Sequence, residues 1–244
     1  MYNIAIILAG GTGSRIGGET PKQFLPLDDG RSILEHSVDA FEQAPSIDEI
    51  AVVIHPDHLD TLQKLCQKNT WQKLSKIIPG GSERWESSWH AILAYLDFSP
   101  SLRVGLLLHD AARPFVSQRI IADVAAALET HEAVTVAIPV TDTIYEIVPA
   151  QKQSNDSSLP PLRGGSGWGF LISSVPPREL FMRAQTPQAF HLDLIADAYM
   201  KALAEDEIMA TDDAGIVRKY EPRHPIFIVQ GEETNRKITY KGDL

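Results

Sequence analysis

A glycine-rich turn followed by two basic residues lies directly after the first apolar segment of the chain. The turn contains Gly10, Gly11 and Gly13, and Arg15 and Lys22 follow it. Glycine has no Cβ, so the backbone can bend tightly there and its N–H groups can converge on an anion. Two cations beside such a turn suit a ligand that carries phosphates. An ordinary strand-to-helix connection with two surface cations explains this segment, taken alone, about equally well.

The spacing of these glycines excludes two common phosphate-binding motifs. A Walker A motif requires Gly-Lys-Ser or Gly-Lys-Thr directly after its loop, and the dinucleotide fingerprint requires the pattern G-x-G-x-x-G. Here Ile16 stands where the third glycine of that fingerprint would fall. The turn therefore belongs to neither class.

A second motif, HDAARP at 109–114, directly follows the apolar run VGLLL. Asp110 is a candidate Mg²⁺ ligand, because Mg²⁺ takes one or two protein carboxylates and completes its shell with phosphate oxygens and water. Arg113 offers a planar fork to a phosphate. An Asp–Arg pair that only caps a strand-to-helix turn is the alternative explanation.

Further polar segments lie at the ends of the expected elements. Gly81, Ser82 and Ser87 occur where a strand gives way to a helix, so they could meet a nucleotide base or ribose. The segments around 178–190, 211–214 and 235–239 carry hydroxyl, amide or cationic groups and are expected on loops, where turn chemistry would explain them equally well. The lone cysteine cannot form an internal disulfide and is expected to be a buried or half-buried helix residue.

The alternation of apolar segments predicts an α/β fold with a mostly parallel central sheet flanked by helices. Strands are expected at 3–8, 49–54, 76–79, 104–109, 133–139 and 226–230. Helices are expected at 32–43, 58–68, 84–96, 117–130, 192–204 and 212–220, with Ser117 as the N-cap of the fourth. Ligands of open sheets bind at the carboxyl ends of strands, so the glycine-rich turn and the segments after 78 and 108 should meet there.

The chain between 141 and about 178 is polar and rich in proline, glycine and serine. We expect a single domain over 1–244 in which this segment forms an arm with strands at 143–148 and 170–175. A two-stranded arm is marginal by itself, so it should pack on something such as a second subunit. For 151–168 a disordered surface insertion is the favoured alternative.

Composition narrows the class of protein further. The mean hydropathy is -0.11, and no apolar run approaches the roughly 18 residues that span a bilayer. The N-terminal segment lacks the basic region of a signal peptide, so a cytoplasmic location is expected. A net charge of -10 argues against nucleic-acid binding through a broad basic surface. A local group of Arg and Lys can still bind a small anion.

Together and in this order, the motifs resemble those of the polyol-phosphate cytidylyltransferases, most closely the 2-C-methyl-D-erythritol 4-phosphate cytidylyltransferase family of the non-mevalonate isoprenoid pathway. The resemblance covers nearly the whole chain and rests on LAGGTGSRIGGETPKQFLPL, ILEHSVDAF, GGSERWESS, HDAARPF, PVTDTIYE, RAQTPQAF, TDDAG and NRKIT. It implies a nucleotidyltransferase α/β fold (Rossmann-like) with a protruding β-arm. It also implies CTP and a polyol phosphate as substrates, Mg²⁺ as cofactor, and a homodimer in which the arm reaches the partner's active site.

The resemblance also implies roles for individual residues. The catalytic residues would be Arg15, Lys22, Arg178 and Lys237. The first two would contact the triphosphate and stabilise charge at the α-phosphorus, whereas the last two would bind the acceptor phosphate, Arg178 from the neighbouring subunit. The nucleotide would be held by Ala9, Gly10, Gly11, Gly13, Gly81, Ser82 and Ser87. Asp110 would also lie near the metal, and the polyol phosphate would contact Asp110, Arg113, Thr143, Thr186 and Thr211.

Two departures from the family pattern concern the arm and therefore the acceptor. The arm carries a long insertion, and the family's Val-Asp-Arg followed two residues later by Leu-Trp is replaced by VPPRELF at 175–181. The expected reaction is transfer of CMP from CTP to 2-C-methyl-D-erythritol 4-phosphate with release of pyrophosphate. Ribitol 5-phosphate or another polyol phosphate is the alternative acceptor. A non-catalytic nucleotide-binding protein of the same fold is the second alternative, and intact Arg15, Lys22 and Asp110 argue against it.

Overall fold

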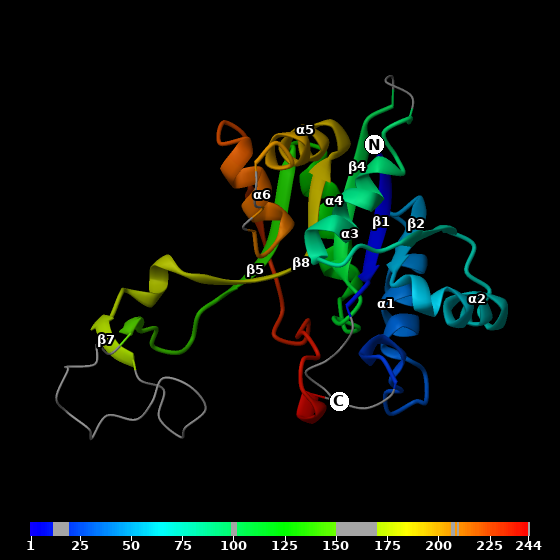
Figure 1. Ribbon diagram of the computed structural model, residues 1–244, viewed down its shortest axis with the longest axis horizontal. Coiled ribbons are helices and arrows are strands. Elements are labelled where there is room, and N and C mark those ends of the chain that lie inside the picture. The colour runs from blue at the N-terminus through cyan, green and yellow to red at the C-terminus, as the bar shows by residue number, and fades with distance from the viewer. Residues whose placement is uncertain (12–19, 99–101, 150–169, 206–207, 209, 244) are drawn as a thin grey trace. The chain divides into compact units, whose positions relative to one another are not determined.

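The computed structural model describes residues 1–11, 20–98, 102–149, 170–205, 208 and 210–243. The chain divides into two compact units, one formed by Met1–Ala137 and Ala184–Leu244 and the other by Ile138–Arg183. The first unit contains the main sheet and the α-helices labelled in Figure 1.

Among the described residues, the main sheet has seven strands in the order β3-β2-β1-β4-β8-β5-β9, and the end of β5 and the start of β8 belong to the second unit. Its strands are β1 (Tyr2–Ala9), β2 (Glu49–Ile54), β3 (Leu74–Pro79), β4 (Val104–Asp110), β5 (Ala133–Pro139), β8 (Met182–His191) and β9 (Phe227–Gln230). β1 is parallel to β2 and β4, β2 to β3, and β5 to β9. The predicted mostly parallel sheet is confirmed, and the carboxyl ends of β1 to β4 meet at one edge.

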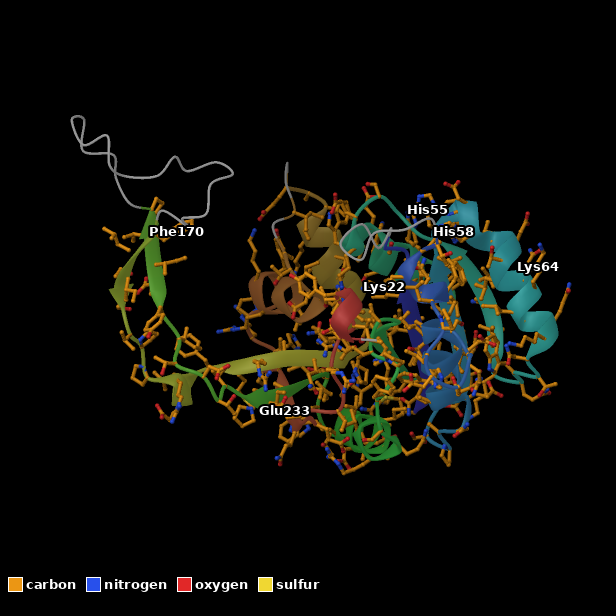
Figure 2. All side chains as sticks on the ribbon, turned by 90° about the horizontal axis from the view of Figure 1, so that it is seen from below. Lys22, His55, His58, Lys64, Phe170 and Glu233 are labelled. Atoms are coloured by element: carbon orange, nitrogen blue, oxygen red, sulfur yellow. The ribbon has the colours of Figure 1, made fainter. Side chains whose placement is uncertain are left out.

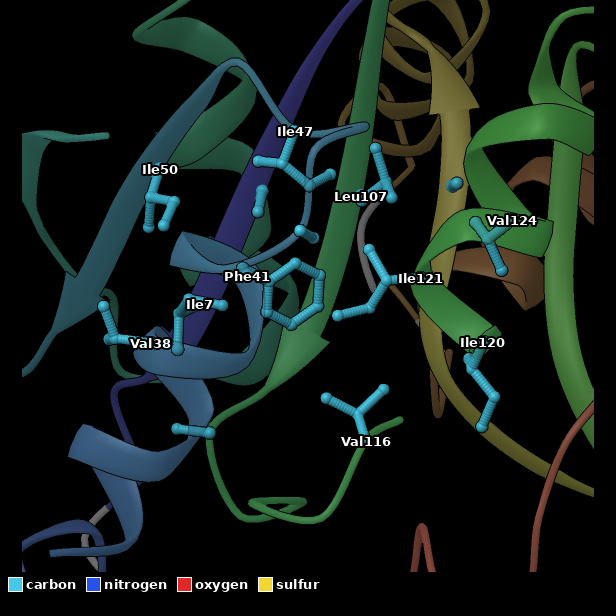
Figure 3. Packing of buried hydrophobic residues seen from close by; sticks show 14 of the residues in the cluster. Ile7, Val38, Phe41, Ile47, Ile50, Leu107, Val116, Ile120, Ile121 and Val124 are labelled. Carbon is cyan, nitrogen blue, oxygen red and sulfur yellow. The ribbon is translucent and has the colours of Figure 1, made fainter. Parts of the chain in front are cut away.

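Helices cover both faces of this sheet. One core contains residues of α1 (Ile33–Glu42), α2 (Leu59–Lys68) and α4 (Gln118–Leu128), and the other contains residues of α3 (Arg84–Leu93), α5 (Leu192–Ala202) and α6 (Asp213–Tyr220). Successive side chains of a strand point to opposite faces, so in β1 Ile7 enters the first core and Ile6 the second. Figure 3 shows Phe41 of α1 packed among Ile7, Leu107 and Ile121 in the first core. Strands buried on both faces explain the nearly continuous apolar runs of the sequence.

The predicted helices are found with small differences at their ends. α4 begins as expected, since the Ser117 side chain accepts a hydrogen bond from Ile120 N at 3.2 Å. α3 ends at Leu93 rather than at 96 because turns follow it. Cys66 lies half-buried on α2, as expected. Among the described residues, the helices are all too short or too polar to cross a membrane.

The segment around 182–191 corrects the prediction of a loop, because it forms strand β8. β8 lies between β4 and β5 in the sheet and pairs antiparallel with β4 over Gln188 to His191. Pro187 lies inside β8, just before the residues that pair with β4, and the Thr186–Pro187 peptide bond is cis. Two polar side chains of β8 are buried with partners: Gln188 Nε2 donates to Asp212 Oδ2 at 2.8 Å, and Gln185 Nε2 donates to Glu232 O at 2.7 Å.

The second unit contains a two-stranded antiparallel sheet of β6 (Glu146–Pro149) and β7 (Phe170–Ser174). The strand predicted at 143–148 thus starts later, because β7 offers pairing partners only from Glu146 onward. The predicted second strand is confirmed within one residue. The insertion predicted at 151–168 lies outside the described residues.

Candidate active site

A cavity of about 310 Å³ opens at the carboxyl edge of the sheet in the first unit. The ends of β1 and β4, the short helix η1 (Lys22–Phe24), the start of α3 and the C-terminal segment line it. It brings together these predicted site residues: Ala9, Gly10, Gly11, Lys22, Gly81, Ser82, Ser87, Asp110 and Lys237. Polar or charged lining residues that the sequence did not single out are Gln23, Glu83, Arg84 and Thr239.

Ser87 ties the two glycine segments of the cavity together. Its Oγ accepts a hydrogen bond from Gly81 N at 3.1 Å. A Cβ on Gly10 would lie only 3.0 Å from the same oxygen. Glycine at position 10 therefore lets the backbone that follows β1 approach the start of α3 closely. On the far side, Gln23 Nε2 donates to Ala9 O at 3.0 Å and holds η1 against the end of β1.

Ser82 lies at the rim of the cavity in a turn that Glu86 organises. Glu86 Oε2 accepts from Ser82 N at 2.6 Å and from Ser82 Oγ at 2.7 Å. These hydrogen bonds lower the pKa of Glu86. The carboxylate therefore fixes the turn that leads into α3.

The C-terminal segment around 235–239 contributes Lys237 and Thr239 to the cavity lining, and the red C-terminal part of the chain lies beside Lys22 in Figure 2. Lys22 Nζ donates to Ile238 O at 2.9 Å, and Ile238 N donates to Ala112 O at 2.8 Å. The neighbouring Lys237 donates from Nζ to Asp110 Oδ2 at 2.7 Å. Lys22 and Lys237, which are far apart in the sequence, thus line the same cavity, because Lys22 contacts the residue that follows Lys237.

Asp110, the last residue of β4, faces a cation at each carboxylate oxygen. Its side chain is 13% exposed, Lys237 contacts Oδ2, and Arg84 Nε lies 3.5 Å from Oδ1. Burial alone would raise the pKa of Asp110, but the charges of Arg84 and Lys237 outweigh it and hold the pKa well below its usual range. The carboxylate is therefore ionised at neutral pH.

Arg84 connects this carboxylate to a second, fully buried one. Its Nη2 lies 2.7 Å from Asp213 Oδ2 at the start of α6. Asp213 Oδ1 accepts a hydrogen bond from Tyr199 OH at 2.6 Å. Burial and the Asp213 charge raise the pKa of Tyr199, so its hydroxyl stays protonated and donates.

A hydrogen-bond network behind the cavity fixes the backbone of Asp110. Asp110 N donates to Thr186 Oγ1 at 3.1 Å, and Thr186 Oγ1 lies 3.0 Å from His109 Nδ1. His109 Nε2 lies 3.0 Å from Arg113 O. Burial lowers the pKa of His109 to about 4. A neutral imidazole fits these partners, since Nε2–H donates to the carbonyl and Nδ1 accepts from the Thr186 hydroxyl.

The other predicted site residues lie outside the lining of this cavity. Arg113 donates from Nη1 to Asn235 O at 2.8 Å and from Nη2 to Ala184 O at 3.2 Å, so it braces the C-terminal segment. Thr211 directly precedes Asp212, whose side chain caps α6. Thr143 and Arg178 belong to the second unit, where Arg178 Nη1 donates to Thr141 O at 2.8 Å. Gly13 and Arg15 lie outside the described residues.

The chain matches the family described as IspD, 2-C-methyl-D-erythritol 4-phosphate cytidylyltransferase, over residues 3–158 and 163–244. A 2-C-methyl-D-erythritol 4-phosphate cytidylyltransferase of Thermobifida fusca (strain YX) is 42% identical over 240 residues, which are 98% of this chain and 89% of that protein. The bifunctional ribulose 5-phosphate reductase/CDP-ribitol pyrophosphorylase Bcs1 of Haemophilus influenzae is 37% identical over 99% of this chain and 46% of its own length.

Solved structures of proteins with similar names share the fold of this chain. The 4-diphosphocytidyl-2C-methyl-D-erythritol synthase of Anaerococcus prevotii DSM 20548 superposes with a TM-score of 0.75 at 27% identity, covering 99% of this chain and 92% of that one. The 2-C-methyl-D-erythritol 4-phosphate cytidylyltransferase of Thermus thermophilus gives a TM-score of 0.69 at 29% identity, with coverages of 99% and 94%.

The Thr186 hydroxyl should be needed for the stability of the wall behind Asp110. Thr186→Val keeps the shape but leaves the Asp110 N–H and His109 Nδ1 without their partner, which we expect to cost about 1–3 kcal/mol of the free energy of unfolding. Thr186→Ser keeps the hydroxyl and is the matched control. Urea unfolding followed by circular dichroism measures both, and equal stabilities of the two variants would contradict this role.

Proposed function

The chain belongs to the 2-C-methyl-D-erythritol 4-phosphate cytidylyltransferase family of nucleotidyltransferases, and we propose that it transfers CMP from CTP to 2-C-methyl-D-erythritol 4-phosphate with release of pyrophosphate. The observation that carries this proposal is the meeting of Lys22, Lys237 and Arg84 in one cavity, next to the Gly10–Gly11 turn. Several cations beside a glycine-rich turn suit a reaction between two phosphate-bearing anions. The use of CTP agrees with a cytoplasmic location, which we also propose.

The proposed reaction needs no protein nucleophile. The acceptor phosphate is largely dianionic near neutral pH, and one of its oxygens attacks the α-phosphorus of CTP. The bond from that phosphorus to the pyrophosphate oxygen breaks, and pyrophosphate leaves with the electron pair. The protein has to hold two anions that repel each other and to offset the charge that grows on the leaving group.

We assign these two tasks to different cations. Lys22, together with Arg15, is proposed to offset charge on the triphosphate and the leaving pyrophosphate. Lys237, together with Arg178 and Arg113, is proposed to hold the acceptor phosphate. In the ligand-free protein the ammonium group of Lys22 contacts Ile238 O, and that of Lys237 contacts Asp110. Phosphate oxygens of the substrates would replace these partners.

We propose that the nucleotide lies between the two glycine segments. The triphosphate would follow Ala9, Gly10, Gly11 and Gly13, and the cytosine would lie near Gly81, Ser82 and Ser87. Support comes from the close approach of Gly10 to Ser87, which joins the two segments into one continuous wall. Thr143, Thr186 and Thr211 are proposed for the acceptor side.

Nucleotidyltransferases of this family generally use a divalent metal, and we propose Mg²⁺ held at Asp110. Among the described residues, no group of three or more His, Cys, Asp or Glu side chains could hold a metal ion. A single carboxylate at the cavity nevertheless fits Mg²⁺, which takes its remaining ligands from phosphate oxygens and water. When bound, the cation would offset negative charge on the triphosphate.

We also propose a homodimer formed through the Ile138–Arg183 unit, an arm of a single nucleotidyltransferase domain. β6 and β7 of this unit, with the residue just before β6, expose large apolar side chains, namely Tyr145, Ile147, Val148, Phe170, Leu171 and Ile172. Such a surface on a two-stranded sheet favours burial against a partner. Arg178 would then act from the neighbouring subunit.

Sedimentation velocity of the purified protein tests this assembly. We expect a dimer at micromolar concentration. Replacement of the two exposed residues Leu171 and Ile172 by serine should shift the protein toward monomer. A wild-type protein that sediments as a monomer would exclude the dimer.

A substrate panel tests the reaction itself. CTP, ATP, GTP and UTP are each combined with 2-C-methyl-D-erythritol 4-phosphate and with ribitol 5-phosphate, and pyrophosphate release is measured with Mg²⁺ present. We expect the fastest release from CTP with the methylerythritol ester. A large preference for ribitol 5-phosphate would overturn the acceptor, and it is the relevant rival because one relative is named a CDP-ribitol pyrophosphorylase. No release from any pair would favour a non-catalytic nucleotide-binding protein.

Lys22→Ala should lower kcat strongly while leaving the fold intact. Loss of one preorganised charge contact to the reacting phosphates typically costs about 10²- to 10³-fold in turnover. Lys64 is exposed on α2 and lies away from Lys22 in Figure 2, so Lys64→Ala is the matched control. Steady-state kinetics with CTP and the acceptor measures both variants, and turnover of Lys22→Ala at the wild-type rate would refute the assignment.

A further inference from the structure

Arg84 joins three segments that lie far apart in the sequence. It is the first residue of α3, Asp110 is the last residue of β4, and Asp213 is the first residue of α6. Its guanidinium places Nη2 2.7 Å from Asp213 Oδ2 and Nε 3.5 Å from Asp110 Oδ1. One planar guanidinium therefore faces two carboxylates through two different nitrogens.

The contact with Asp213 fixes the position of the Arg84 guanidinium. Asp213 is completely buried, and Tyr199 OH donates to its Oδ1 at 2.6 Å. Tyr199 is also buried and stacks on Trp89, with ring centroids 5.9 Å apart. A buried carboxylate loses much of its hydration and has to keep its cation. Arg84 is therefore held in place whether or not it contacts Asp110.

The other cation at Asp110 has a different character. The Lys237 side chain is 40% exposed, and its ammonium group lies at the end of a flexible aliphatic chain. Arg113 of the HDAARP motif also acts on Asp110 through its charge, but its Nη1 and Nη2 donate to backbone carbonyls. Asp110 is thus shared between one anchored cation and one exposed cation that can move to another partner.

We propose that Arg84 is a positioning residue that keeps a cation beside Asp110, so that Lys237 can leave Asp110 for the phosphate of the acceptor. The inference rests on the proposed function, which assigns Lys237 to that phosphate. The charges of Arg84, Lys237, Asp110 and Asp213 sum to zero in the ligand-free protein. When Lys237 turns to the acceptor, Arg84 still faces both carboxylates. Without Arg84, Asp110 would keep only Lys237 as an ion-pair partner among the described side chains, beside the Mg²⁺ proposed at this carboxylate, and Lys237 would leave it less readily.

The test is a double-mutant cycle between Arg84 and Lys237. Arg84→Met alone would leave Asp213 buried without its cation, so the main variant is Arg84→Met/Asp213→Asn. This pair removes both buried charges together, and the amide oxygen of the new side chain would still accept from Tyr199. Lys201→Met/Glu221→Gln is the matched control, because it removes an ion pair that joins α5 to the end of α6 outside the cavity.

We expect Arg84→Met/Asp213→Asn to raise the KM of the acceptor about tenfold while the KM of CTP changes less than about twofold, and the control should change neither. In the wild-type background Lys237→Ala should lower kcat/KM for the acceptor about 100-fold. In the Arg84→Met/Asp213→Asn background the same change should cost at least tenfold less, because residues that share one partner are not additive.

Equal costs of Lys237→Ala in both backgrounds would overturn the inference and leave Arg84 a structural link only. Arg84→Lys covers the case in which the double variant does not fold. It preserves the charge balance with Asp213, but it lacks the second nitrogen that Arg84 directs to Asp110, so a loss of coupling to Lys237 in the same direction is expected. A wild-type protein that turns over no acceptor would overturn the proposed function, and an active one with additive costs would overturn this inference alone.

Discussion

The pairing of charges at the carboxyl end of β4 is the interaction on which the rest of the site depends. Asp110 is largely removed from water there, and such a carboxylate is stable only with cations close to it. Arg84 and Lys237 supply them from the start of α3 and from the C-terminal segment. The fold therefore has to bring distant segments to one point. A parallel sheet does this well, because its strands end at a common edge and the loops that follow them converge.

The same carboxylate is oriented through its backbone as well as through its charge. β8 lies beside β4, and its Thr186 hydroxyl accepts from Asp110 N while it faces the neutral ring of His109. Asn235 Nδ2 donates to Thr186 O at 2.9 Å, so the C-terminal segment that carries Lys237 is tied to the same wall. One connected network thus restrains the backbone of Asp110 and of the segment that carries Lys237, and leaves the Lys237 side chain exposed.

The helices and most strands were predictable because apolar periodicity is a local signal. β8 was not, since Gln185, Thr186 and Gln188 are polar and Pro187 argues against a strand. The groups that satisfy these side chains, such as Glu232 O and Asp212, lie elsewhere in the chain. Arg84 and Asp213 stand in two recognised motifs, GGSERWESS and TDDAG, but no spacing rule links one to the other. Their pairing is a tertiary contact that only the fold creates.

A net charge of -10 is compatible with the anion-binding role proposed for the cavity, because the cations at Asp110 have carboxylate partners. Asp110 and Asp213 offset Arg84 and Lys237, so these two cations are already paired in the ligand-free protein. An anion that recruits Lys237 has to compete with Asp110 for it. A singly charged carboxylate ligand gains little from that exchange, whereas a dianionic phosphate interacts about twice as strongly with the same ammonium at equal distance. In the proposed reaction, preference for a phosphate-bearing acceptor would therefore follow from the competition with Asp110 rather than from an excess of positive charge.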